Sequence, residues 1–421
     1  MTSRECIKGA LAHKETDRVA VDLGATPVTG ISASTLSRLR DILGLKGNMW
    51  VKINEPYQML GEVDDDVRAA LGIDTVPLLP PRNLFGFENK GWKPWKLFDG
   101  TPVLVPEKFN TEPEPDGSIL MYPEGDKTVP PSGKMPKGGF YFDTIVRQIP
   151  IDEDRLNPED NLEEFKPISD EDLEYFRKES ERLYTSTDFA IIATFGGTAF
   201  GDIALVPAPF LKFPKGIRGI EEWYISTLMR RGYVYEVFER QCEIALKNLE
   251  RLKQAVGNRV EAVFITGTDF GTQTSQFVSR DTYRELYKPF HKRVNDWVHT
   301  NTTWKTFIHS CGAVEPLISE FIEAGFDILN PVQCSAAGME PELLKEKYGK
   351  DITFWGGGVD TQKTLPFGTP DEVRQEVGER LRIFSKGGGF VFNPVHNIQA
   401  KTPAENIIAM FETVKNFKKG D

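Results

Sequence analysis

The sequence predicts an α/β fold, a (β/α)8 TIM-type barrel with a β-rich insertion in its N-terminal half. Three observations favour this fold. From residue 169 onward, short runs of β-branched residues alternate with longer helical stretches, a pattern that builds a parallel sheet covered by helices. A Pro- and Gly-rich segment with little helical periodicity covers residues 80–168. No strand leads into a G-x-G-x-x-G turn, which disfavours a doubly wound dinucleotide-binding sheet.

Residues 1–79 are expected to form the N-terminal part of the barrel domain. Ser3 is a candidate N-cap for an opening helix, and residues 18–24 are typical of a first strand. The helical pattern returns over residues 31–44 and stops at a glycine. A further strand is expected near residues 73–78, which brings the expected number of strands close to eight.

Residues 80–168 are expected to form an inserted β-rich lobe that caps the mouth of the barrel. The steps Asp99-Gly100 and Asp116-Gly117 separate short apolar segments, and Asp-Gly is a hairpin signal. A disordered linker is the alternative, but disordered segments are poor in aromatic residues. The aromatic residues here are Trp92, Trp95, Phe98, Phe109, Tyr122, Phe140, Tyr141 and Phe142.

Residues 169–421 are expected to form the main barrel segment and to carry the site. Its predicted strands are 189–194, 261–266, 304–309, 326–330, 351–355 and 389–393. Its predicted helices include 233–256, 281–300, 313–324, 340–348, 370–386 and 403–417. In a barrel of this type, chemistry takes place where the strands end and the following loops begin.

Composition excludes several classes of protein. The 421 residues carry 51 Lys and Arg against 62 Asp and Glu, a net charge of −11, which argues against non-specific binding to nucleic acid or an anionic membrane. No run approaches the roughly 18 apolar residues of a membrane span, and the charged N-terminus lacks the apolar region of a secretion signal. Four cysteines are too few for a disulfide scaffold, so we expect a cytoplasmic protein.

Four potential metal ligands follow predicted strands. His309 and Cys311 are two residues apart on an extended segment, so their side chains point to the same side. Cys334 and His396 follow two later strands. Imidazole and thiolate suit Zn²⁺, which takes four ligands. The alternative is that Cys311 is a buried small apolar residue and that Cys334 and His396 are packed loop residues.

Two acidic residues stand at other strand ends and are candidate catalytic groups. Asp269 follows the strand at 261–266, and Asp360 follows the strand at 351–355. Either carboxyl could orient a ligand or protonate a leaving group. Each of the two carboxyl groups could equally well cap the helix that follows it.

Several short segments of the chain together resemble a known family. The chain resembles the uroporphyrinogen decarboxylase superfamily and, within it, the cobalamin-dependent methyltransferase branch. The segments that carry the resemblance are 19–24 (VAVDLG), 269–273 (DFGTQ), 287–291 (YKPFH), 307–312 (FIHSCG), 329–333 (LNPVQ), 354–360 (FWGGGVD) and 402–406 (TPAEN).

The resemblance implies a (β/α)8 barrel with zinc on an H-x-C pair and a later Cys, where zinc activates a thiol such as coenzyme M. At the place of that later Cys, this chain has His396. The function implied is a zinc-dependent methyltransferase that moves a methyl group between a small methylated substrate, or a thiol acceptor, and a corrinoid protein. The partner would present methylcobalamin or cob(I)alamin.

Two other functions stay open. The first is a metal-free decarboxylase or lyase of the uroporphyrinogen decarboxylase type. The family's decarboxylases hold a tetrapyrrole's carboxylates with an arginine-containing N-terminal loop, and residues 24–34 of this chain contain no arginine. The second is a non-enzymatic corrinoid or tetrapyrrole carrier, against which the absence of a D-x-H-x-x-G motif argues.

Overall fold

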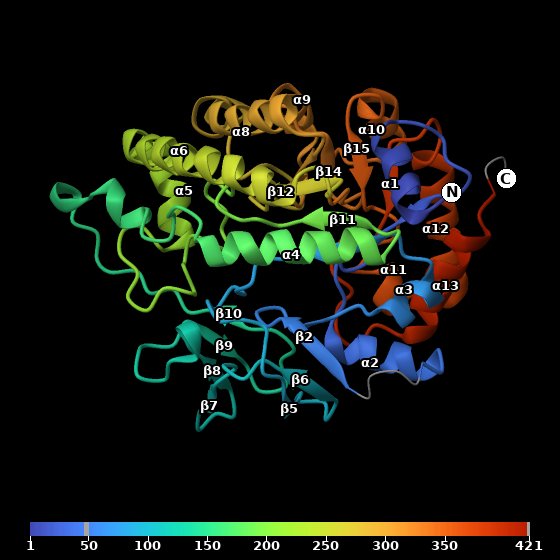
Figure 1. Ribbon diagram of the computed structural model, residues 1–421, viewed down its shortest axis with the longest axis horizontal. Coiled ribbons are helices and arrows are strands. Elements are labelled where there is room, and N and C mark those ends of the chain that lie inside the picture. The colour runs from blue at the N-terminus through green and yellow to red at the C-terminus, as the bar shows by residue number, and fades with distance from the viewer. Residues whose placement is uncertain (46–49, 419–421) are drawn as a thin grey trace.

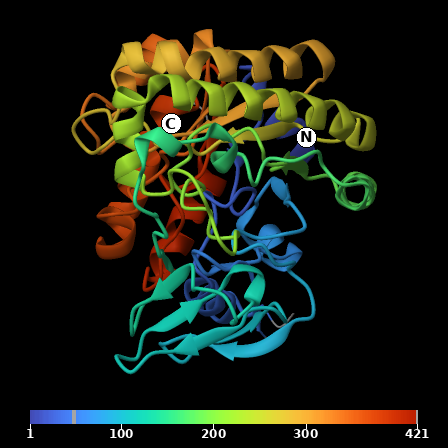
Figure 2. The same ribbon diagram turned by 90° about the vertical axis from the view of Figure 1, so that its left-hand side faces the viewer.

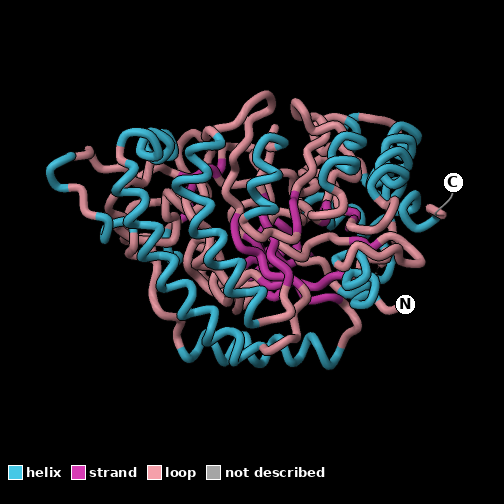
Figure 3. Tube along the Cα trace, turned by 90° about the horizontal axis from the view of Figure 1, so that it is seen from above, coloured by secondary structure: helices cyan, strands magenta, loops and turns pink. Residues whose placement is uncertain are grey.

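The computed structural model describes residues 1–45 and 50–418. Eight strands form one sheet in which every neighbouring pair is parallel. Seen from above, the strands lie at the centre and helices surround them (Figure 3). The predicted barrel is confirmed. In sheet order, the strands are β1 (Ala20–Val21), β16 (Phe390–Phe392), β15 (Thr353–Trp355), β14 (Ile328–Asn330), β13 (Lys305–His309), β12 (Ala262–Thr266), β11 (Ala190–Ala193) and β4 (Thr75–Leu78).

One aspartate closes the barrel between β1 and β4. The backbone N–H of Asp74 donates to the carbonyl of Val21 at 2.8 Å. The Asp74 carboxylate accepts the Val21 N–H at 2.9 Å and binds both terminal nitrogens of Arg18 at 2.6 and 2.5 Å. Charge-assisted paired hydrogen bonds of this kind are stronger than neutral ones. They therefore join the two edge strands where no regular ladder forms.

Helices cover the outside of this sheet (Figure 1). The predicted helix at 281–300 is divided into α7 (Arg280–Thr282), a π-helical turn η4 (Tyr283–Tyr287) and α8 (Lys288–Asn301). No helix of the described chain is long and apolar enough to cross a membrane. The remaining helices are α1 (Ser3–Leu11), α2 (Ala33–Ile42), α3 (Asp65–Leu71), α4 (Asp170–Ser186), α5 (Ile220–Met229), α6 (Arg231–Val256), α9 (Glu315–Glu323), α10 (Pro341–Tyr348), α11 (Thr364–Phe367), α12 (Pro370–Phe384) and α13 (Ala404–Asn416), with short turns η1 (Pro123–Gly125), η2 (Glu153–Arg155) and η3 (Pro158–Asn161).

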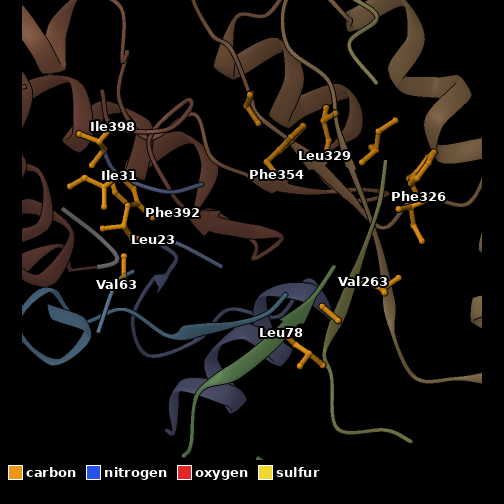
Figure 4. Close-up of a cluster of buried hydrophobic side chains, with 14 of the residues drawn as sticks. Leu23, Ile31, Val63, Leu78, Val263, Phe326, Leu329, Phe354, Phe392 and Ile398 are labelled. Carbon is orange, nitrogen blue, oxygen red and sulfur yellow. The ribbon is translucent and has the colours of Figure 1, made fainter. Parts of the chain in front are cut away.

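The core has two layers because side chains alternate along each strand. Leu329 and Phe354 belong to the large outer layer between strands and helices (Figure 4). Phe307 and Ile328 belong to a smaller inner cluster, which also includes Cys6 of α1. Helix α1 therefore packs against the inner cluster. In β13, the alternation that turns Phe307 inward also turns His309 inward.

A β-rich lobe lies beside the barrel, below it in Figures 1 and 2. It holds two four-stranded sheets, one of which takes β2 and β3 from residues before 80. The division of the chain at residues 79 and 168 stays a prediction. The strands are β3 (Leu60–Gly61), β2 (Val51–Glu55), β6 (Pro102–Val105) and β5 (Lys93–Lys96) in one sheet, and β10 (Asp143–Thr144), β9 (Gly133–Met135), β8 (Ile119–Met121) and β7 (Thr111–Pro113) in the other.

Both Asp-Gly steps lie in hairpins of this lobe. Gly100 lies between the antiparallel strands β5 and β6, and Gly117 lies between β7 and β8. Their φ angles are +87° and +82°, in the region that glycine adopts without steric cost. The lobe has an aromatic core in which Phe142 contacts Phe85 and Phe109 edge-on. Packing of this kind is incompatible with a disordered linker.

Candidate metal centre

Three side chains meet at the C-terminal end of the barrel strands. His309 ends β13, points inward and is only 3% exposed. Cys311 lies in the turn after it, and His396 lies in the loop after β16. The ligand atoms of these three residues all lie within 4.8 Å of one another. The Cys311 Sγ is 3.3 Å from the His309 Nε2.

The buried amide of Asn330 sets the tautomer of His309. Asn330 is the register partner of His309 on the neighbouring strand β14. Its Nδ2 donates to the carbonyl of Trp355 at 2.7 Å, which leaves the Oδ1 to accept the His309 Nδ1–H at 2.6 Å. The lone pair of His309 therefore resides on Nε2 and faces Cys311. Metal-binding histidines are commonly held by such a second hydrogen bond.

Asp269 lies beside the cluster in the loop after β12. Its Oδ1 accepts the backbone N–H of Cys311 at 2.7 Å and is 4.0 Å from the His309 Nε2. The two loops approach closely because both carry glycine. A Cβ on Gly271 would lie 2.6 Å from the Cys311 carbonyl, and Gly312 has a φ of +88°. Burial raises the pKa of Asp269.

The protonation of the three side chains fits a zinc ion. Burial lowers the pKa of His309 and of His396 to about 4, so both imidazoles are neutral near pH 7, the form that binds metal. Burial also raises the pKa of the Cys311 thiol well above its usual value. A divalent cation reverses that effect, because a coordinating thiol is deprotonated. Catalytic zinc sites use three protein ligands of these types.

Two of the predicted site residues lie outside this cluster. Among the described residues, the group close enough to hold a metal comprises only His309, Cys311 and His396. The Cys334 Sγ contacts the carbonyl of Val332 at 3.4 Å. The Asp360 Oδ1 accepts two backbone N–H groups of its own loop, at 2.6 and 2.9 Å. A ligand role for Cys334 and a catalytic role for Asp360 stay predictions.

A cavity of about 430 Å³ opens onto the cluster. His309, His396 and Asp269 line it from the barrel, together with Asp202 in the loop after β11. Glu55, at the end of β2, lines it from the lobe. Sequence reasoning missed both Glu55 and Asp202. A signal existed for Asp202 alone, since it follows a predicted strand and the glycine pair at 196–197.

Comparison with known proteins agrees with this arrangement. The family model of uroporphyrinogen decarboxylase (URO-D) matches residues 224–417. A uroporphyrinogen decarboxylase from Prochlorococcus marinus (strain NATL2A) is 22% identical over 311 residues, which cover 72% of this chain and 79% of that protein. The C-terminal part of the chain is therefore similar to the uroporphyrinogen decarboxylase family. The superfamily resemblance seen in the sequence is thereby confirmed.

Two further comparisons concern a short segment and the whole fold. A uroporphyrinogen decarboxylase from Psychromonas ingrahamii is 32% identical over 77 residues, 17% of this chain and 21% of that protein. A solved structure, a methyltransferase from Methanosarcina mazei, has a TM-score of 0.54 and 16% identity, and the match covers 99% of each chain. That likeness concerns the fold. The segment matched by the family model includes the three clustered side chains and Asp269, whereas Glu55 and Asp202 precede it.

Proposed function

We propose that the protein is a zinc-dependent methyltransferase that moves a methyl group between a small substrate and a corrinoid protein. The observation that carries the proposal is the convergence of His309, Cys311 and His396 at the barrel mouth, directly on a cavity large enough for a small molecule. A metal site with a substrate cavity on it is what Lewis-acid chemistry requires. The fold shared with a methyltransferase is consistent with this function.

The residues of the chain have distinct tasks in this proposal. His309, Cys311 and His396 would hold zinc, which would polarise the heteroatom that carries the methyl group or lower the pKa of a bound thiol. Asn330 keeps the His309 Nε2 unprotonated. Asp269 fixes the Cys311 turn through the Cys311 N–H and can hold a proton for a leaving group, because burial raises its pKa.

The partner in this proposal is a corrinoid protein of the same cytoplasmic compartment. It would supply cob(I)alamin as the acceptor, or methylcobalamin as the donor, of the methyl group. One thiolate and two imidazoles carry less negative charge than a set with two thiolates. The metal is then more electrophilic, which favours polarisation of a methylated substrate over activation of a thiol.

Metal content is the first test. Protein purified without a His tag is expected to contain about one zinc per chain, as a three-ligand catalytic site requires. The variants His309→Ala and His396→Ala are expected to lose it. His299→Ala is the matched control, because the His299 imidazole binds Asp327 at 2.7 Å away from the cluster. It should keep its metal.

Turnover is the second test. Metal-loaded protein is expected to methylate cob(I)alamin from a methylated substrate, and the visible spectrum of the corrinoid reports this reaction. The variant His309→Ala should not catalyse it. Full methylation activity without zinc would refute the zinc dependence. Absence of both bound metal and methyl transfer would favour a metal-free decarboxylase, the activity named for the curated relatives. The acetate groups of uroporphyrinogen would need several cations. Arg82 is the one Lys or Arg among the described residues that line the cavity, and it pairs with Asp172 at 3.1 Å.

A further inference from the structure

The cavity on the metal cluster is acidic. Glu55, Asp202 and Asp269 line it. The single arginine in its described walls, Arg82, is already bound to the carboxylate of Asp172 on α4. The protein therefore offers a bound ligand three carboxyl groups and no unpaired lysine or arginine within the described lining.

Glu55 and Asp202 are held in place by backbone groups. The two carboxylate oxygens of Glu55 accept the N–H groups of Tyr57 and Gln58 at 3.2 and 2.7 Å. The Asp202 Oδ1 accepts the Ala204 N–H at 2.9 Å. Burial raises the pKa of Glu55 to about 7 and that of Asp202 to about 6.

The rest of the wall is largely apolar and of modest size. Leu79, Leu84, Leu205, Phe210 and Ile265 contribute to it. A cavity of about 430 Å³ lies at the small end of ligand sites, which range over roughly 300–1,000 Å³. It accommodates a molecule built on about one ring and is too small to enclose a corrin. A corrinoid must therefore reach the cluster from the rim, while the substrate occupies the cavity.

We propose that Glu55 and Asp202 make this cavity select an uncharged methylated substrate with an apolar, ring-sized body and reject anionic ones. Only the methyl group of the substrate rests on the proposed function; the selection by charge and size does not. An anionic group placed beside Glu55 and Asp202, away from the metal cluster, loses its water, finds no unpaired lysine or arginine in the described wall and meets like charge, so its binding is penalised. An uncharged ligand avoids this repulsion, and its hydroxyl groups can donate hydrogen bonds to the carboxylates.

The metal cluster supplies a separate argument about how the substrate lies in the cavity. His309 and His396 line the cavity, so the methyl-bearing atom of the substrate must face the metal cluster. A quaternary ammonium has no lone pair to offer there, whereas the oxygen of a methyl ether or the sulfur of a methyl thioether has one. A thiol acceptor that carries a sulfonate or carboxylate is disfavoured by the acidic wall.

Binding calorimetry on the metal-loaded, full-length protein at pH 7.5 tests this selection. The probes are 2-methoxyphenol (uncharged) and 4-methoxybenzoate (anionic). The wild type is expected to bind the uncharged probe at least about tenfold more tightly than the anion, the discrimination expected of one unpaired buried charge. The double variant Glu55→Gln with Asp202→Asn should bind 4-methoxybenzoate at least about tenfold more tightly than the wild type does, with 2-methoxyphenol changed by less than about threefold.

Glu174→Gln is the matched control, since it removes a carboxyl from the exposed face of α4, and it should leave both affinities unchanged. If the double variant does not fold, Asp202→Asn alone is expected to move the ratio in the same direction. Equal or tighter binding of the anion by the wild type, or an unchanged ratio in the folded variants, overturns the inference. Because binding is measured without methyl transfer, selective binding with no methylation of cob(I)alamin would refute the proposed function and leave the selectivity standing.

Discussion

Asn330 allows the sharpest test of how the metal cluster is built. The replacement Asn330→Ala removes the acceptor of the His309 Nδ1–H and the donor to the Trp355 carbonyl, two hydrogen bonds of 2.6 and 2.7 Å. The Asn330 side chain is fully buried, so water cannot replace it without entering the core. Without its hydrogen bond to Asn330, the His309 imidazole could carry its proton on Nε2, the atom that faces Cys311.

The expected magnitude follows from these two contacts. Each buried polar group left unpaired costs roughly 1–3 kcal/mol, so the loss of two partners should lower the free energy of unfolding of the metal-free protein by about 2–6 kcal/mol. Loss of a supporting hydrogen bond to a metal-binding histidine lowers metal affinity about 10–100-fold. That corresponds to about 1.4–2.7 kcal/mol of binding free energy.

Zinc affinity is measured by competition with a chromophoric chelator at pH 7.5, and stability by urea unfolding of the metal-free protein. Asn295→Ala is the matched control, because Asn295 is also fully buried and donates a hydrogen bond to a carbonyl, that of Ala324 at 2.8 Å. It should lose stability but keep its zinc affinity. A folded Asn330→Ala protein that binds zinc within about threefold of the wild type would refute the role assigned to Asn330.

Three further outcomes follow from the site and the core. Cys334→Ala should keep its zinc and Cys311→Ala should lose it, as read by plasma mass spectrometry. Asp360→Ala should cost about 1 kcal/mol of stability through its two lost hydrogen bonds to the loop backbone, with turnover within about threefold, whereas Asp269→Ala should lower turnover about 100-fold. The fully buried His291 has a pKa lowered to about 3 by burial, against 6.5. Below pH 6.5 the unfolded chain therefore binds a proton that the folded protein does not, and stability falls by up to about 1.4 kcal/mol per pH unit. His291→Gln should flatten that slope in urea unfolding between pH 6.5 and 4.5, and an equally steep variant would contradict this account.

The strands, and the positions of two of the three clustered side chains, can be predicted from the order of neighbouring residues in the sequence. Period-two alternation in β13 places His309 on the inner side with Phe307, and Cys311 follows two residues later. The hairpins at Gly100 and Gly117 follow from dipeptide chemistry alone. Such features depend on residues close in sequence, so a single chain suffices to predict them.

The remainder depends on contacts between distant segments. Asn330 acts on His309 only because β13 and β14 pair in one particular register. Cys334 and His396 follow strands in the same way, and the path of each loop decides which of them reaches the cluster. Glu55 comes from the lobe and Asp202 from a barrel loop, and no periodicity relates two such positions.

The pairing of β1 with β16 has a consequence for how the protein matures. This pairing joins residues 20–21 to 391–392, so the ring of strands cannot close on the ribosome until nearly the whole chain has been synthesised. His396 follows the same last strand, and the metal cluster is therefore completed by the same late event. A metal held jointly by His309 and His396 links strand β13 to the segment that completes the ring. Binding of that metal to the closed form alone would add its free energy to closure. On the proposed function, zinc supply would then determine how much newly made chain reaches the native state.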